Sequence, residues 1–140
     1  MTKAKSILIA EDQEDDILLM EIALAELALE GEYAVAQDGQ EALDYLYCRG
    51  SHANRSRGNP KLMLLDWNLP KINGQEILQE IRKDKQFDTV SVVVFSSSLA
   101  EKDQEEALFE GANAFMTKPM DLADFLLSVR KTVATYLSYT

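Results

Sequence analysis

The chain has 140 residues, 46% hydrophobic and 27% charged, with six glycines and three prolines; this is the composition of one folded globular domain and excludes disordered, collagen-like and low-complexity chains. Fourteen Lys and Arg against 24 Asp and Glu give a net charge of -10, which repels phosphate backbones and anionic lipids, so we expect no nucleic-acid partner and no membrane. The single cysteine cannot form an intrachain disulfide, and the apolar run near the N-terminus is too short for a signal peptide or a membrane span, so we expect a cytoplasmic protein.

The first predicted elements are a buried strand and a helix. Residues 6–10 form a short apolar run that stops at Glu11 and Asp12, which is typical of a strand buried on both faces. Apolar residues then recur at nearly helical spacing and predict a helix from residue 14 to about residue 30. Gly31 follows as the glycine that commonly ends a helix.

A second strand and helix follow, and then a long loop. Residues 33–36 predict a short strand, and Asp38 is placed to cap a helix whose apolar positions extend to Tyr47. Residues 49–61 contain two glycines, one proline and no long apolar side chain, so they predict a loop. This loop has four Lys or Arg residues and no acid, and we favour a solvated loop over a partner contact.

A third strand and helix occupy the middle of the chain. Residues 62–65 are wholly apolar and also stop at an acid, Asp66, so they predict a strand buried on both faces. Residues 68–74 have the composition of a turn-rich loop. Apolar residues at positions 77, 78 and 81 then predict a helix that ends near residue 84.

The last part of the chain predicts two more strands, each followed by a helix. Residues 90–95 are the next apolar run, and Ser98 with Glu101 has the spacing of a capping box that opens a helix to Glu110. Gly111 lies just past the end of that helix. Residues 114–117 predict a short strand, and residues 121–136 predict a final amphipathic helix.

Five strands therefore alternate with five helices, which predicts an α/β fold with a parallel sheet and helices on both faces. Ligands of such sheets bind at the carboxyl ends of the strands. Five polar residues follow or end predicted strands and so should meet at one edge: Glu11, Asp12, Asp66, Ser96 and Lys118.

These residues suggest a particular chemistry. Carboxylates crowded at one edge repel each other unless a cation neutralises them, and Mg²⁺ prefers carboxylate, carbonyl and water oxygens. Lys118 and Ser96 can hold phosphoryl oxygens, and Asp66, at the end of the central strand, is the candidate nucleophile. A carboxylate, a metal ion, an ammonium and a hydroxyl are together what is needed to form and hold an acyl phosphate.

From residue 5 to about residue 136 the sequence resembles the receiver domain of two-component response regulators, which accepts a phosphoryl group from a histidine kinase onto an aspartate. The resemblance implies a flavodoxin-like (βα)5 three-layer sandwich with strand order 2-1-3-4-5, a single receiver domain over residues 1–140, and no output domain. The matching positions are Glu11-Asp12, residues 64–70 around Asp66, Gly74, Ser96, Gly111-Ala112 and Lys118-Pro119.

The resemblance also assigns roles. Asp12 and Asp66 would bind Mg²⁺ through their side chains and Asn68 through its backbone carbonyl, with Glu11 acting through water. Asp66 would accept the phosphoryl group, and Ser96 and Lys118 would contact it. The peptide bond between Lys118 and Pro119 is expected to be cis. The chain would be a phosphoacceptor signalling protein that assists its own phosphorylation and dephosphorylation, and not an enzyme.

Within the family, the sequence resembles the stand-alone receivers that serve cyanobacterial and bacterial phytochromes, and the features that carry this resemblance are the long loop before the third strand, residues 64–71, residues 77–84 and the hydroxyl run 96–98. A sensor histidine kinase, with a bacterial phytochrome as the candidate, is therefore the expected partner. Trp67 is either a half-exposed aromatic residue or a contact for that kinase, and the sequence leaves both open.

The resemblance places a switch at Ser96 and Phe115, positions where this family more often has Thr and Tyr. Readout would occur through the face built by the helix after Ser98, the strand 114–117 and the last helix, with homodimerisation as one use. The apolar residues expected to contribute are Phe109, Phe115, Phe125 and Leu126.

Three other functions are compatible with an α/β fold of this kind. Haloacid-dehalogenase-like phosphatases need a second acid two residues after the nucleophile, where this chain has Asn68. A flavodoxin-type flavin carrier needs a phosphate loop after the first strand, where this chain has an acidic run. A receiver-fold binding module that signals without phosphorylation is the remaining alternative.

Overall fold

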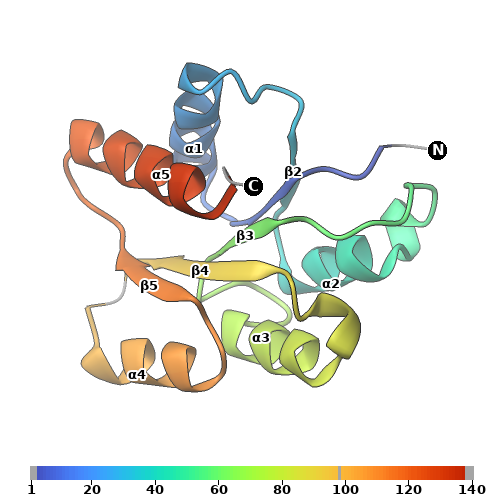
Figure 1. The fold of residues 1–140 in the computed structure, drawn as a ribbon. Helices are drawn as coiled ribbons and strands as arrows, with labels where there is room; N and C mark the ends of the chain where they lie inside the picture. The colour runs from blue at the N-terminus through green and yellow to red at the C-terminus, as the bar shows by residue number, and fades with distance from the viewer. Residues whose placement is uncertain (1–2, 98, 138–140) are drawn as a thin grey trace.

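The computed structural model of the chain describes residues 3–97 and 99–137. One parallel sheet in the order β2-β1-β3-β4-β5 forms the middle layer, and helices cover both faces (Figure 1). This confirms the predicted flavodoxin-like architecture and strand order. The strands are β1 Ile7–Ala10, β2 Tyr33–Ala36, β3 Leu62–Leu65, β4 Ser91–Ser96 and β5 Ala114–Thr117. The helices are α1 Glu14–Glu26, α2 Gly39–Tyr47, α3 Gly74–Lys83, α4 Glu101–Phe109 and α5 Leu122–Leu137, with short 3-10 helices at Gly50–His52 and Lys85–Phe87.

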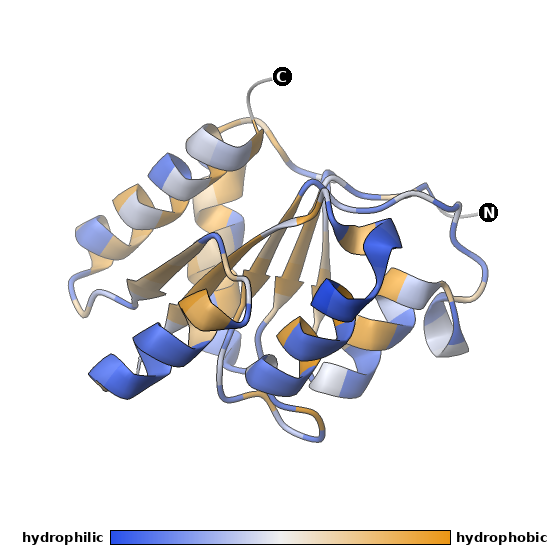
Figure 2. Ribbon diagram, turned by 60° about the horizontal axis from the view of Figure 1, so that its bottom comes forward, coloured by the Kyte–Doolittle hydropathy of each residue, from blue (hydrophilic) through white to orange (hydrophobic). Residues whose placement is uncertain are grey.

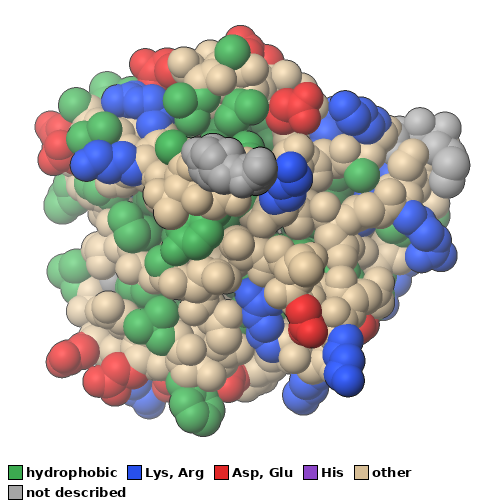
Figure 3. All heavy atoms as spheres, viewed as in Figure 1, with side chains coloured by type: hydrophobic (Ala, Val, Ile, Leu, Met, Phe, Trp, Pro, Cys, Tyr) green, Lys and Arg blue, Asp and Glu red, His purple; other side chains and the backbone are tan. Residues whose placement is uncertain are grey.

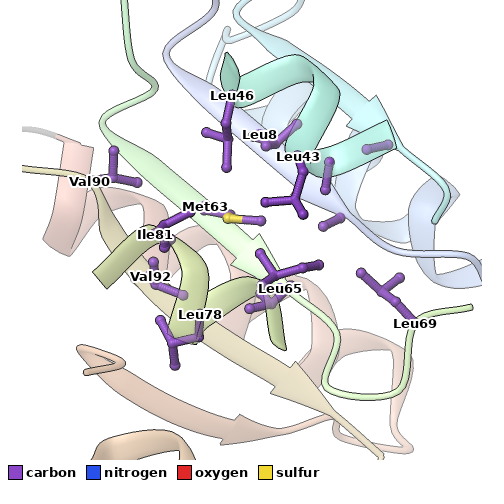
Figure 4. Close-up of a cluster of buried hydrophobic side chains, with 14 of the residues drawn as sticks. Leu8, Leu43, Leu46, Met63, Leu65, Leu69, Leu78, Ile81, Val90 and Val92 are labelled. Atoms are coloured by element: carbon purple, nitrogen blue, oxygen red, sulfur yellow. The ribbon is translucent and has the colours of Figure 1, made fainter. Parts of the chain in front are cut away.

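The two faces of the sheet bury two separate apolar clusters. Alternate residues of each central strand point to opposite faces, so that Leu8 packs toward α2 and α3, whereas Ile7 packs toward α1 and α5. Figure 2 shows the strands hydrophobic along their length and the helices hydrophobic only on one side. Figure 4 shows the first cluster, in which Met63 and Leu65 of β3 meet Leu43 and Leu46 of α2.

The first helix ends earlier than the sequence pattern suggests. α1 stops at Glu26, and Ala28 takes a left-handed backbone conformation with φ 58°. The Leu29 N–H then donates to the Leu24 carbonyl and the Ala28 N–H donates to the Ala25 carbonyl, which is the Schellman arrangement. An alanine therefore ends α1, and the prediction that Gly31 does so is wrong.

The helix starts are partly as expected. Asp38 caps α2, because its side chain accepts the N–H of Glu41 at 2.8 Å. α3 starts with a capping box between Asn73 and Glu76 that the sequence reading missed. α4 begins later than expected, with Ala100 as its N-cap residue, so Ser98 is not the residue that directly precedes the helix; Ser98 itself lies outside the described residues.

The loop between α2 and β3 is tied down by a buried arginine. Arg55 is only 3% exposed, and its guanidinium lies over the Tyr45 ring at 4.1 Å from the ring centre. The same group donates to the backbone carbonyls of four residues, namely Tyr45, Leu46, Ser56 and Gly58. The expectation of a simple solvated loop is therefore wrong for its central residue.

Within residues 3–97 and 99–137, none of the helices combines the length and hydropathy that crossing a bilayer requires.

Candidate functional site

The backbone brings the predicted residues to one edge of the sheet. Glu11 follows β1, Asp66 follows β3, Ser96 ends β4 and Lys118 follows β5. The sheet hydrogen bonding continues through these positions: the Asp66 N–H donates to the Ala10 carbonyl at 2.9 Å, and the Lys118 N–H donates to the Ser96 carbonyl at 2.8 Å. The side chains are therefore placed by the rigid sheet and not by a loose loop.

Three carboxylates converge at this edge. One oxygen each from Glu11, Asp12 and Asp66 lies within 4.8 Å of the others. Glu11 and Asp66 are buried, and Asp12 is half-buried. Three carboxylates so close together suit a hard divalent cation, because Mg²⁺ and related ions take oxygen ligands and offset the repulsion among them.

Burial destabilises the ionised form of the Glu11 side chain. The loss of hydration raises the pKa of Glu11 to about 7, and the neighbouring Asp66 charge acts in the same direction, against the lowering effect of Lys118. The Gln13 N–H also donates to Glu11 at 3.0 Å, which fixes the direction of the carboxylate. A bound cation would relieve this cost, so the site as it stands fits a metal ion.

Lys118 is the cation of the site. Its side chain is 8% exposed, and its Nζ lies 2.7 Å from Glu11 Oε1, 2.8 Å from Asp16 Oδ2 and 3.6 Å from Asp66 Oδ2. Burial alone would lower the pKa of Lys118, but the hydrogen bonds to Asp16 and Glu11 and the charge of Asp66 outweigh it and raise the pKa above its usual value. The ammonium ion is thus held charged inside the site.

Asp16 is a site residue that the sequence reading did not identify. It lies on the first turn of α1, 102 residues before the lysine it contacts. The signal available in the sequence was only its place in the acidic run at the start of the predicted helix. That signal does not name Lys118 as the partner.

The segment after β3 is folded tightly. The Asn68 N–H donates to Asp66 Oδ1 at 3.2 Å, and Asn68 itself is exposed. Trp67 is only 5% exposed and belongs to the apolar cluster under α2 and α3, so the expectation of a half-exposed ring is wrong, and a kinase contact stays an untested alternative that this burial does not favour. Gly74 allows this closeness, because a Cβ there would lie 2.7 Å from the Asp66 carbonyl oxygen and 2.8 Å from the Trp67 Cα.

The expected switch residues lie beside Lys118. Ser96 is fully buried and pairs with Thr117 of β5. Phe115 is partly buried against the cluster on the α2 and α3 face. The peptide bond between Lys118 and Pro119 is trans, since the described residues contain no cis peptide bond; the expectation of a cis bond is wrong.

The face formed by α4, β5 and α5 is partly as expected. Figure 3 shows apolar side chains gathered along the edge where β5 lies between α4 and α5. Phe109 is 89% exposed, whereas Phe125 is buried in the cluster under α1 and α5. Phe125 is therefore a core residue and not part of an exposed contact surface.

Comparison with known proteins gives consistent relatives. Residues 7–130 match the family model described as the response regulator receiver domain. The probable methanogenesis regulatory protein FilR2 of Methanothrix harundinacea is 30% identical over 133 residues, which is 95% of this chain and 84% of FilR2. Response regulator Rcp1 of Synechocystis sp. is 33% identical over 126 residues, which is 90% of this chain and 84% of Rcp1.

Solved structures agree with these relatives. The phosphorylated cyanobacterial phytochrome response regulator RcpA has a TM-score of 0.87 and 36% identity, over 98% of this chain and 94% of that one. The Mn²⁺-bound form of Rcp1 has a TM-score of 0.87 and 31% identity, over 97% of both chains.

Proposed function

Because the chain belongs to the response regulator receiver domain family, we propose that it accepts a phosphoryl group on Asp66 and signals through altered protein contacts. It is a signalling protein of the two-component type. The observation that carries the proposal is the meeting of three carboxylates and one buried ammonium at the carboxyl edge of the sheet. Each part has a task in forming and keeping an acyl phosphate.

In the transfer, a carboxylate oxygen of Asp66 forms a bond to phosphorus while the bond from phosphorus to the donor nitrogen of a phosphohistidine breaks. The electron pair of that bond stays on the imidazole, which leaves as the neutral ring once it has its proton. The hydrogen bond from the Asn68 N–H holds Asp66 Oδ1, which orients the carboxylate for attack. Burial of Asp66 keeps water away from the resulting acyl phosphate.

We propose Mg²⁺ as the cofactor of this site. Asp12 and Asp66 would hold it through their side chains, Asn68 through its backbone carbonyl, and Glu11 through water. When bound, Mg²⁺ supplies positive charge that neutralises the carboxylates and the phosphoryl oxygens. The Mn²⁺-bound form of Rcp1 supports a divalent cation in a related receiver.

After transfer, Lys118 donates to one phosphoryl oxygen and Ser96 donates its hydroxyl to another. Both residues are linked to β5, because the Ser96 carbonyl accepts the Lys118 N–H. Drawing them toward the phosphoryl group would shift β5 and Phe115 and so change the α4, β5 and α5 face, through which a second copy of the chain could bind.

We propose a sensor histidine kinase as the phosphodonor, with a phytochrome as its sensory part. RcpA is described as a cyanobacterial phytochrome response regulator, and this chain covers nearly all of it at 36% identity. Purified phytochrome kinase should then transfer its phosphoryl group to this chain faster than an unrelated kinase does.

The experiment that tests the acceptor role is incubation with Mg²⁺ and a small phosphodonor, followed by intact-mass measurement. We expect the mass of one phosphoryl group to be added, and only when the divalent cation is present. A chain that never gains this mass under any donor would instead support a binding module that signals without phosphorylation.

A further inference from the structure

Lys118 contacts three carboxylates, and one of them differs from the other two. Glu11 and Asp66 belong to the group that can hold a metal ion, whereas Asp16 does not. Asp16 lies on the first turn of α1, and its side chain is 24% exposed, so it stands at the outer side of the buried ammonium. Its hydrogen bond to Lys118 measures 2.8 Å.

A buried ammonium ion needs an anionic partner that stays available. Glu11 and Asp66 would share their charge with a bound cation and would then attract Lys118 less strongly. The Asp16 carboxylate would keep its full charge for the lysine. An ammonium has three N–H donors, so one donor can remain on Asp16 while the others face the phosphoryl oxygens near Asp66.

We propose that Asp16 is a positioning residue for Lys118: it holds the ammonium from the α1 side so that the lysine meets the phosphoryl group on Asp66 already oriented. This inference rests on the proposed function of Asp66 as the acceptor. It makes α1 part of the phosphoryl site, although α1 contributes no ligand to the phosphoryl group itself.

A merely structural role is the competing explanation, because α1 and α5 pack together along their length. The ion pair between Glu26 of α1 and Arg130 of α5, at 2.6 Å, joins these helices away from the site. Glu26→Ala is therefore the matched control for a lost link between the helices. Asp15→Asn is the matched control for charge, since Asp15 is the exposed neighbour of Asp16 and the substitution changes the net charge equally.

The test is a double-mutant cycle between Asp16→Asn and Lys118→Ala, with phosphoryl incorporation followed by intact mass. We expect Asp16→Asn to slow incorporation about tenfold when Lys118 is present, because one charge-assisted hydrogen bond is lost. In the Lys118→Ala background the same substitution should have almost no effect. Any direct repulsion of the donor by Asp16 acts in both backgrounds and cancels from the ratio.

Three outcomes would overturn the proposal. The first is an equal slowing by Asp16→Asn in both backgrounds, and the second is an equal slowing by Asp15→Asn or Glu26→Ala. The third is a failure of Asp16→Glu, which keeps the charge, to restore most of the rate lost in Asp16→Asn.

A second readout needs neither metal nor phosphodonor. In urea unfolding of the metal-free protein, Asp16→Asn should lower the midpoint when Lys118 is present. In Lys118→Ala it should leave the midpoint unchanged or raise it, since it then only removes one of several repelling acids. An equal lowering in both backgrounds contradicts the pairing. If the wild-type chain takes up no phosphoryl group, the proposed function fails while this second cycle still tests the pair.

Discussion

At the carboxyl end of the sheet Lys118 lies among three carboxylates, whereas in the loop at the amino end Arg55 lies among four backbone carbonyls. Both cations are buried. Backbone carbonyls are uncharged dipoles fixed by the folded loop, so the arginine has four permanent acceptors for its N–H groups.

The carboxyl end is different because acids outnumber the cation. Four acids lie there with a single ammonium, which contacts Glu11, Asp16 and Asp66, and burial together with the charge of Asp66 raises the pKa of Glu11. A buried charge alone is therefore no sign of a functional site in this molecule. What marks the functional site is an excess of negative charge that a bound ligand would balance.

The largest effect is expected at the acceptor. Asp66→Asn should abolish phosphoryl incorporation completely while leaving the free energy of unfolding of the metal-free protein unchanged or higher, because one of the crowded acids is neutralised. Intact mass and urea unfolding measure the two quantities. Full incorporation in this variant would remove Asp66 from its proposed role.

Arg55→Ala should do the opposite. We expect a loss of about 2–4 kcal/mol of unfolding free energy, because several carbonyls lose their donor and Tyr45 loses its stacked cation. The folded fraction should be phosphorylated at the wild-type rate. Arg57→Ala is the control: this exposed arginine in the same loop should change stability by no more than about 0.5 kcal/mol. If Arg55→Ala slowed phosphorylation without unfolding the chain, the two ends could not be treated as separate.

Gly74→Ala should affect both stability and chemistry. The added methyl group would press on the Asp66 carbonyl and on Trp67, at an expected cost of about 1–3 kcal/mol, and the displaced acceptor should also react more slowly. Gly31→Ala gives the comparison, since its Cβ would meet nothing and only its φ of 81° is unfavourable, about 1 kcal/mol. Equal phosphorylation rates in the two variants would count against a role for tight folding after β3.

At Lys118 we expect acceptance to be slowed and not lost. Lys118→Ala should still be phosphorylated, about tenfold more slowly, yet should fail to change its partner contacts, because the lysine links the phosphoryl group to β5. Lys118→Arg should not rescue it, since a planar guanidinium is wider than an ammonium held among three acids. Mass measurement beside the dimer fraction in sedimentation separates the two effects. Normal switching in phosphorylated Lys118→Ala would leave the lysine as a charge neutraliser only.

Much of the fold could be predicted because the central strands are buried on both faces. Such strands are uninterrupted apolar runs, and in β1 and β3 each run ends where an acid begins. The convergence of Asp12, Asp66 and Lys118 then followed from the parallel sheet, since its strands end at one edge.

The missed features depend on contacts between distant residues. The partner of Asp16 is 102 residues away, and the burial of Trp67 depends on the close approach of Gly74. Arg55 stands in a segment of polar composition, and its burial depends on the Tyr45 ring and on backbone carbonyls that only the folded loop brings around it. The early end of α1 has a local cause, the left-handed backbone conformation of Ala28. Alanine rarely takes this conformation, so the sequence pattern predicted that the helix ends at Gly31 instead.

The position of Lys118 on the last strand has a consequence for the chain during its synthesis. A ribosome adds residues from the N-terminus, so the acids of β1 and β3 are made long before the lysine that lies after β5. Until β5 joins β4 at the sheet edge, the three acids would face each other with no ammonium between them. On the proposed function, a nascent chain would therefore lack the ammonium that contacts the phosphoryl group until the last strand has joined the sheet.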